Sequence, residues 1–188
     1  MFPMGQIKRI LSHPNGLTLF RVAASPIIVV LLLFPNRLTT FLAALFFSAA
    51  AITDFLDGFF ARQKGMVSNF GKVMDPIADK VLVSTSFIML TSLGWIPAWI
   101  VCIIIGREIS VTGLRNIIAQ RCQDLSASSL GKYKTGFQIA AIIPLMLHFS
   151  YLGIDFHAIG ILFLWAALVL TIWSGADYFI RFRSLLRA

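Results

Sequence analysis

The sequence predicts an all-α polytopic membrane protein with six transmembrane helices. Of its 188 residues, 58% are hydrophobic and 13% are charged, and its mean hydropathy is +0.85. An ordinary soluble domain carries about 25% charged residues, so this balance is typical of an integral membrane protein. The apolar residues also gather in stretches of about 20, the length that an α-helix needs to cross a bilayer.

Six such stretches follow one another and take up most of the chain. They are Leu17–Phe34, Leu38–Phe60, Val73–Leu93, Ile96–Ile118, Gly136–Tyr151 and His157–Phe179. The loops between them are short, so we expect a single membrane domain over residues 1–188. Ahead of the first stretch, the segment Ile7–Leu11 mixes basic and apolar residues. It predicts a short amphipathic helix that lies on the membrane surface.

The distribution of Lys and Arg predicts how the chain is oriented, because cytoplasmic loops carry an excess of both. Arg37 is the one basic residue expected on the outer side. The other side holds Lys8, Arg9, Arg62, Lys64, Lys72, Arg121, Lys132, Lys134, Arg181, Arg183 and Arg187. We therefore expect a multi-pass protein of the inner (cytoplasmic) membrane with both termini in the cytoplasm. The net charge of +8 predicts contact with membrane lipids, and no nucleic-acid partner is expected.

Half of the acidic residues lie in one short window that runs from the end of the second stretch to the start of the third: Asp54, Asp57, Asp75 and Asp79. An isolated carboxylate at the centre of a membrane helix costs about 2.5–3.5 kcal/mol, so such residues are usually paired, metal-bound or catalytic. Asp54 and Asp57 share one helix face, and Asp75 and Asp79 share a face of the next helix. Because a short loop joins these helices, we expect both pairs to lie at the same depth.

Carboxylate oxygens at such spacing are typical ligands of Mg²⁺. Phosphate groups of a substrate usually complete the coordination of this ion. Two such ions about 3.5–4 Å apart stabilise an in-line displacement at phosphorus. Gly58 leaves room for a phosphate group beside the carboxylates, and Arg62 is placed to bind one in a bidentate manner. The alternative is an ion-pair network of the four aspartates with Arg21, Arg62, Lys72 and Lys80. Metal binding explains the spacing better, because buried salt bridges stabilise a fold little.

The run from Asp54 to Asp79 carries a resemblance to a known family. It reads D-F-L-D-G-F-F-A-R, eight residues, then G-K-V-M-D-P-I-A-D. This is similar to the signature D-x-x-D-G-x-x-A-R-x8-G-x-x-x-D-x-x-x-D of the CDP-alcohol phosphatidyltransferases. The resemblance covers the entire chain and agrees with a six-span layout whose site faces the cytoplasm.

The resemblance implies roles for residues at matching positions. Asp54, Asp57 and Asp75 would hold two divalent cations, Mg²⁺ first and Mn²⁺ as the alternative. Asp79 would be the catalytic base and would also lie at the second ion. The residues implied to bind the CDP-diacylglycerol donor are Asn15, Thr18, Gly58, Arg62 and Ser68. Asn15 and Thr18 also fit a plain helix start with capping residues, and both interpretations stay open.

A second set of basic residues predicts the alcohol that accepts the phosphatidyl group. Arg107 and Arg115 lie in a predicted span, and Lys132 and Lys134 precede the next one. This set is larger than topology requires and indicates an acceptor that is itself a phosphate ester. Alternatively, the lysines only set the topology and Arg107 pairs with Glu108 or Asp177. Adjacent helical residues point in different directions, so Asp177 is the expected partner of Arg107.

These stretches resemble the branch of the family whose acceptor is glycerol 3-phosphate, which implies phosphatidylglycerophosphate and CMP as products and a homodimer as the assembly. Other acceptors stay open within the family: inositol phosphate, serine or phosphatidylglycerol. An aspartate-rich prenyltransferase is a rival of another class, which the spacing of the motif fits poorly. A divalent-cation transporter is a third hypothesis. The acidic residues of a transporter should line a path open to both faces of the membrane, whereas the outer side of this chain is almost free of charge.

Overall fold

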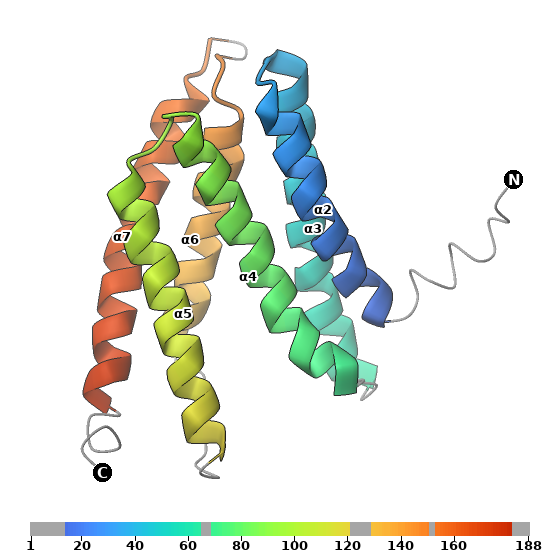
Figure 1. The fold of residues 1–188 in the computed structure, drawn as a ribbon, viewed down its shortest axis with the longest axis vertical. Helices are drawn as coiled ribbons and strands as arrows, with labels where there is room; N and C mark the ends of the chain where they lie inside the picture. Colours follow the sequence, from blue (N-terminus) through green and yellow to red (C-terminus); the bar gives the residue numbers. More distant parts are fainter. Residues whose placement is uncertain (1–13, 65–68, 121–128, 151–152, 182–188) are drawn as a thin grey trace, which may run out of the picture. The chain divides into compact units, whose positions relative to one another are not determined.

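The computed structural model describes residues 14–64, 69–120, 129–150 and 153–181. Over these ranges every helix is an α-helix, and no β-strand occurs. In chain order the helices are α2 (Pro14–Leu33), α3 (Arg37–Lys64), α4 (Asn69–Ser92), α5 (Ala98–Gln120), α6 (Ser129–Met146) and α7 (Phe156–Arg181) (Figure 1). Each of them overlaps one of the predicted apolar stretches. The prediction of an all-helical protein is therefore confirmed.

The bounds of α6 differ most from the prediction. This helix begins at Ser129 instead of Gly136 and ends at Met146 instead of Tyr151. Hydropathy marks where apolar residues begin, whereas a helix can begin among polar residues that satisfy its free N–H groups. Lys132 and Lys134 consequently belong to α6 and do not lie in a loop before it. The amphipathic helix predicted at Ile7–Leu11 falls outside the described residues.

One helix in the described part of the chain is long and apolar enough to cross a membrane. It is the segment Phe156–Ile180 of α7, with 25 residues and a mean hydropathy of 2.1. The apolar segments Phe20–Leu33 of α2 and Arg37–Thr53 of α3 are shorter, and the prediction of six spans is not confirmed.

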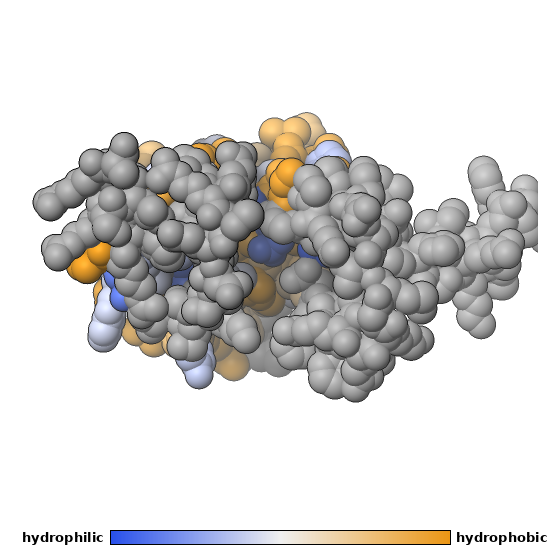
Figure 2. Space-filling model, turned by 90° about the horizontal axis from the view of Figure 1, so that it is seen from below, coloured by the Kyte–Doolittle hydropathy of each residue, from blue (hydrophilic) through white to orange (hydrophobic). Residues whose placement is uncertain are grey.

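Large hydrophobic side chains are also widely exposed on the described helices, among them Leu162 at 70% and Val30 at 61%. In Figure 2, hydrophobic side chains reach the surface at the upper edge of the view. A water-soluble monomer rarely exposes such large apolar surfaces. Together with the long apolar segment of α7, this exposure indicates a membrane protein.

The chain falls into two compact units, Met1–Met89 and Leu90–Ala188. In the first unit, α2 packs against α3. Side chains four residues apart on α2, namely Ala24, Ile28 and Leu32, are fully buried, as is Phe47 of α3. This is the spacing of one helix face, and it explains why the two helices pair along their lengths. Arg21 lies on the same side of α2 and is only 2% exposed.

A capping box starts α3 directly after α2. The side-chain oxygen of Asn36 accepts hydrogen bonds from the backbone N–H groups of Leu38 and Thr39, at 2.9 and 3.0 Å. In return, the Thr39 hydroxyl oxygen accepts a hydrogen bond from the Asn36 N–H, at 3.0 Å. These contacts satisfy N–H groups that the first turn of a helix leaves free. The polypeptide therefore reverses within residues 34–36.

In the second unit, α7 packs against both α6 and α5. Its core includes the fully buried side chains of Ile142 on α6 and Leu164 on α7, and Ile104 of α5 is 1% exposed. The link into α5 begins with a Schellman motif: Gly94 has φ of 72°, its N–H donates to Thr91 O at 2.9 Å, and Trp95 N–H donates to Leu90 O at 3.1 Å. Glycine adopts this left-handed conformation without steric cost. The motif ends α4 and starts the short connection to α5.

Candidate functional site

The four aspartates of the motif lie on two consecutive helices, as predicted. Asp54 and Asp57 belong to the second half of α3, and Asp75 and Asp79 belong to the first half of α4. Residues 65–68 alone separate these helices along the chain. The carboxyl end of α3 and the amino end of α4 therefore meet at the same end of the first unit (Figure 1). This places both pairs of aspartates on helical backbone near one turn of the chain.

The side chains of Asp54, Asp57 and Asp75 lie outside the described residues, and Asp79 is half-buried. Among the side chains that the structure does describe, no group of three or more His, Cys, Asp or Glu residues is placed to hold a metal ion. Three of the four predicted ligands are not among these side chains, so the metal site stays a prediction. The described backbone is compatible with it.

The residues expected to bind the donor divide between two helices. Asn15 and Thr18 lie in the first turns of α2, and Gly58 and Arg62 lie near the end of α3. Since α2 and α3 are consecutive, packed and joined by a tight reversal, the start of α2 lies at the same end of the unit as the aspartates. The side chains of Asn15, Thr18 and Arg62 are outside the described part, and Ser68 lies wholly outside it.

A buried polar cluster occupies the second unit, where α5 faces α6. The Lys134 ammonium group donates to Glu108 Oε1 and forms an ion pair with it. The Gln138 amide donates to the same oxygen at 3.4 Å. Lys134 is only 3% exposed and Gln138 only 2%. A cation predicted to bind the acceptor is therefore enclosed in the protein and neutralised by one carboxylate.

Arg107 extends this cluster toward α7. Its Nη2 donates to the Ser174 hydroxyl oxygen at 3.0 Å, and its Nη1 lies 3.8 Å from Glu108 Oε1. A Cβ atom added to Gly175 would lie 3.1 Å from Arg107 Cγ and 3.7 Å from Nε. The absence of a side chain at Gly175 thus lets the arginine lie against the backbone of α7. Hereafter the polar cluster means Arg107, Glu108, Lys134, Gln138 and Ser174.

The structure corrects one expectation about these residues. Adjacent residues on a helix point in different directions, and Glu108 was for that reason not expected to pair with Arg107. The 3.8 Å contact shows that both side chains are long enough to curl toward each other. The structure brings Arg107 and Lys134 together through Glu108, whereas the side chains of Arg115 and Lys132 lie outside the described residues.

Sequence reasoning missed three members of this site: Gln138, Ser174 and Gly175. Gln138 carried a signal, because it is a polar residue inside an apolar stretch and lies one helical turn after Lys134. Ser174 and Gly175 carried a weaker one, since small residues are common wherever two membrane helices approach closely. Their contact with Arg107 depends on how α5 packs against α7, and that pairing is not visible in the sequence.

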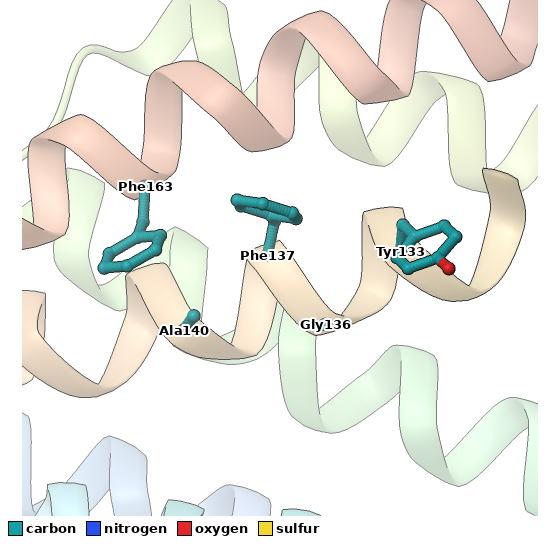
Figure 3. A pocket seen from close by; sticks show the side chains of 5 residues that line it. All are labelled: Tyr133, Gly136, Phe137, Ala140 and Phe163. Atoms are coloured by element: carbon teal, nitrogen blue, oxygen red, sulfur yellow. The ribbon is translucent and has the colours of Figure 1, made fainter.

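An apolar groove lies along another side of α6, where Tyr133 and Gly136 are exposed. It has a volume of about 370 Å³ and is lined by Tyr133, Gly136, Phe137, Ala140 and Phe163. Figure 3 shows Phe137 of α6 and Phe163 of α7 as neighbours, with Tyr133 farther along α6; the phenylalanine ring centroids are 6.0 Å apart. None of the predicted site residues lines this groove. The polar cluster and the groove thus occupy different sides of α6.

Comparison with known proteins gives the same family as the motif. Residues 11–173 match the family model described as CDP-alcohol phosphatidyltransferase. A protein of Bacillus subtilis is 40% identical over 181 residues, which cover 88% of this chain and 92% of the relative. A Rickettsia bellii protein is 40% identical over 167 residues, with the same coverage of 88% and 92%. A protein of Escherichia coli K12 is 36% identical over 169 residues, which cover 88% and 91%.

All three relatives carry the name CDP-diacylglycerol–glycerol-3-phosphate 3-phosphatidyltransferase. The family match covers most of the chain, including the whole aspartate motif and the polar cluster except Ser174. It implies a transferase that uses divalent cations. The chain belongs to the CDP-alcohol phosphatidyltransferase family.

Proposed function

We propose that the protein transfers the phosphatidyl group of CDP-diacylglycerol to glycerol 3-phosphate, giving phosphatidylglycerophosphate and CMP. The observation that carries this proposal is the set of relatives with that named activity, which share up to 40% identity over 88% of the chain. The complete motif from Asp54 to Asp79 supports the phosphatidyl transfer. The buried cations Arg107 and Lys134 support an acceptor that carries a phosphate group.

The residues present fit two divalent cations. Four carboxylates on α3 and α4, close to one turn of the chain, form the all-oxygen donor set that Mg²⁺ prefers. Asp54, Asp57, Asp75 and Asp79 would hold the ions. Bound there, the ions would neutralise the diphosphate and make CMP a better leaving group. Mg²⁺ is the first expectation and Mn²⁺ the alternative.

The chain's own residues supply the proton transfer and the binding of substrates. The Asp79 carboxylate would take the proton from the primary hydroxyl of glycerol 3-phosphate. At the same time, the oxygen of that hydroxyl would attack the phosphorus that bears diacylglycerol. The bond from this phosphorus to the CMP oxygen then breaks, and CMP departs. Gly58 and Arg62, with Ser68, Asn15 and Thr18, would bind the donor.

The acceptor phosphate would be bound by Arg107, Arg115, Lys132 and Lys134. The structure describes the side chains of Arg107 and Lys134, and both form ion pairs with Glu108. An arginine binds a phosphate through two parallel hydrogen bonds, and a lysine binds it as a point charge. An acceptor without a phosphate group, such as serine, would leave these cations without a phosphate to bind.

We also propose the membrane arrangement that the charges predict. One domain over residues 1–188 would span the inner membrane six times, with both termini and the site on the cytoplasmic side. The aspartates lie where α3 ends and α4 begins, next to the basic segment that holds Arg62 and Lys64. A site at the membrane boundary can accept a diacyl donor from the bilayer and glycerol 3-phosphate from water. A homodimer is proposed from family membership alone.

A panel of acceptors tests the proposed function. Purified protein is supplied with CDP-diacylglycerol and, separately, with glycerol 3-phosphate, inositol phosphate, serine or phosphatidylglycerol, and CMP release is measured for each. We expect kcat/KM to be highest with glycerol 3-phosphate, and higher than with serine by at least about tenfold, because an acceptor without the phosphate group leaves the buried cations without their expected partner. Release of CMP with another acceptor alone would overturn the assignment. Pyrophosphate as the product would indicate a prenyltransferase.

A further inference from the structure

Glu108 is the centre of the polar cluster. One of its oxygens, Oε1, accepts a hydrogen bond from Lys134, lies 3.4 Å from Gln138 Nε2 and lies 3.8 Å from Arg107 Nη1. The contacts join α5, which carries Glu108 and Arg107, to α6, which carries the other two residues. A single carboxylate oxygen thus organises two of the cations that the acceptor phosphate would meet.

A carboxylate at this place is unexpected if its surroundings serve only to attract an anion. It repels a phosphate group, and it cancels one of the positive charges of Arg107 and Lys134. Its presence therefore needs a physical reason. Burial supplies one, because Lys134 is only 3% exposed and a buried ammonium group is costly without a partner of opposite charge. The carboxylate makes it possible to keep the lysine charged inside the helical unit.

The same carboxylate also restricts where the cations can be. A lysine side chain has several rotatable bonds and loses much rotamer freedom when it binds a ligand. Here the Lys134 Nζ atom is already held by Glu108, and Gln138 holds the carboxylate in turn. Arg107 is held from two sides, by Glu108 and by the Ser174 hydroxyl at 3.0 Å. Cations that are fixed before binding cost less entropy when the substrate arrives.

We propose that Glu108 is a positioning residue for the acceptor: it keeps Lys134 charged, and it orients Lys134 and Arg107 for the phosphate of the incoming alcohol. Gln138 and Ser174 assist it by holding Glu108 and Arg107, respectively. This inference rests on the proposed function, because it names residues that act through two cations assigned to the acceptor phosphate. The rival explanation is a purely structural ion pair that joins α5 to α6.

Steady-state kinetics of the purified full-length protein separate these explanations. In Glu108→Gln the carboxylate charge is lost at nearly constant shape, and we expect KM for glycerol 3-phosphate to rise about tenfold or more, which corresponds to about 1.4 kcal/mol. KM for CDP-diacylglycerol should change less than twofold. Glu108→Asp keeps the charge on a shorter side chain, so its KM for glycerol 3-phosphate should lie between those of the wild type and Glu108→Gln. Ser110→Ala, an exposed neighbour on α5, is the matched control and should leave both KM values unchanged.

A double-mutant cycle then asks whether Glu108 acts through Lys134. If it does, Glu108→Gln should raise KM for glycerol 3-phosphate by a smaller factor in a Lys134→Met background than in the wild type, since the interaction with Lys134 is already gone. Independent, multiplicative effects would overturn the proposal, as would an unchanged KM in Glu108→Gln or equal changes in both KM values.

A further variant keeps the test decisive if Glu108→Gln does not fold. Gln138→Leu removes one donor to the carboxylate and should raise KM for glycerol 3-phosphate by a smaller factor, again without changing that of CDP-diacylglycerol. An unchanged KM in a folded Gln138→Leu would then overturn the inference. Wild-type protein that shows no turnover with glycerol 3-phosphate would refute the proposed function itself. A fully active wild type with an insensitive Glu108 would refute only the positioning role.

Discussion

Replacement of Gly160 by Ala should destabilise the second unit, because α7 lies tightly against Leu145 of α6 at this glycine. A Cβ atom added to Gly160 would lie 2.6 Å from Leu145 Cγ, 2.9 Å from its Cδ2 and 2.9 Å from its backbone nitrogen. The Leu145 side chain is itself fully buried and has little space to move into. The backbone nitrogen cannot turn away as a side chain does, so α6 itself would have to shift.

The size of the effect follows from two opposing contributions. An extra methyl group in a packed core costs about 1–3 kcal/mol, whereas Ala is favoured over Gly inside a helix by about 0.8–1.0 kcal/mol. Because one clash involves backbone, we expect the upper half of the first range and a net loss of about 1–2 kcal/mol. For a protein of this size, a loss of 1 kcal/mol lowers Tm by about 2–4 °C. The displaced α6 should also raise KM for glycerol 3-phosphate, since it carries Lys134.

Thermal unfolding of the purified variants in one detergent measures this effect. The matched control is Gly113→Ala on α5, the same substitution at a helical glycine whose added Cβ meets nothing within 4 Å. We expect Gly113→Ala to unfold at or above the wild-type Tm and Gly160→Ala to unfold several degrees below it. Equal Tm values for the two variants would refute the inferred contact between α6 and α7.

Three further outcomes follow. Asp79→Asn should lower kcat by about 10²–10⁴-fold, the usual contribution of a general base, with donor binding largely kept; a kcat near wild type would remove Asp79 from the base role. Chelation of divalent cations should abolish turnover and added Mg²⁺ should restore it, whereas full activity in the chelator contradicts the metal proposal. Gly175→Ala places a Cβ 3.1 Å from Arg107 Cγ; moving that side chain about 30° off its rotamer costs about 0.5–1.5 kcal/mol. We therefore expect a several-fold higher KM for glycerol 3-phosphate, and an unchanged value would count against a role of Arg107 there.

The motif and the helices could be predicted from the sequence because both depend on local spacing. The apolar stretches locate every helix except α6 to within four residues, and the spacing of Asp54, Asp57, Asp75 and Asp79 indicates the family. The start of α6 at Ser129 was missed because hydropathy does not register the polar first turns of a helix.

The contacts of the polar cluster could not be predicted in the same way. They join Arg107 and Glu108 to residues at sequence separations of 26, 30 and 67, and such pairs depend on how helices pack. The expectation that Arg107 would not pair with Glu108 rested on side-chain directions along one helix. It overlooked how far an arginine and a glutamate can reach around that helix, as their 3.8 Å contact shows. The pairing of Arg107 with Asp177 stays a prediction.

Transfer of an isotopic label tests the central claim most directly. Glycerol 3-phosphate labelled with ¹⁸O at its primary hydroxyl is incubated with CDP-diacylglycerol, Mg²⁺ and the purified protein, and both products are analysed by mass spectrometry. Attack of that hydroxyl on the phosphorus bearing diacylglycerol predicts phosphatidylglycerophosphate that keeps the label, with unlabelled CMP. Labelled CMP, or the formation of neither product, would contradict the account.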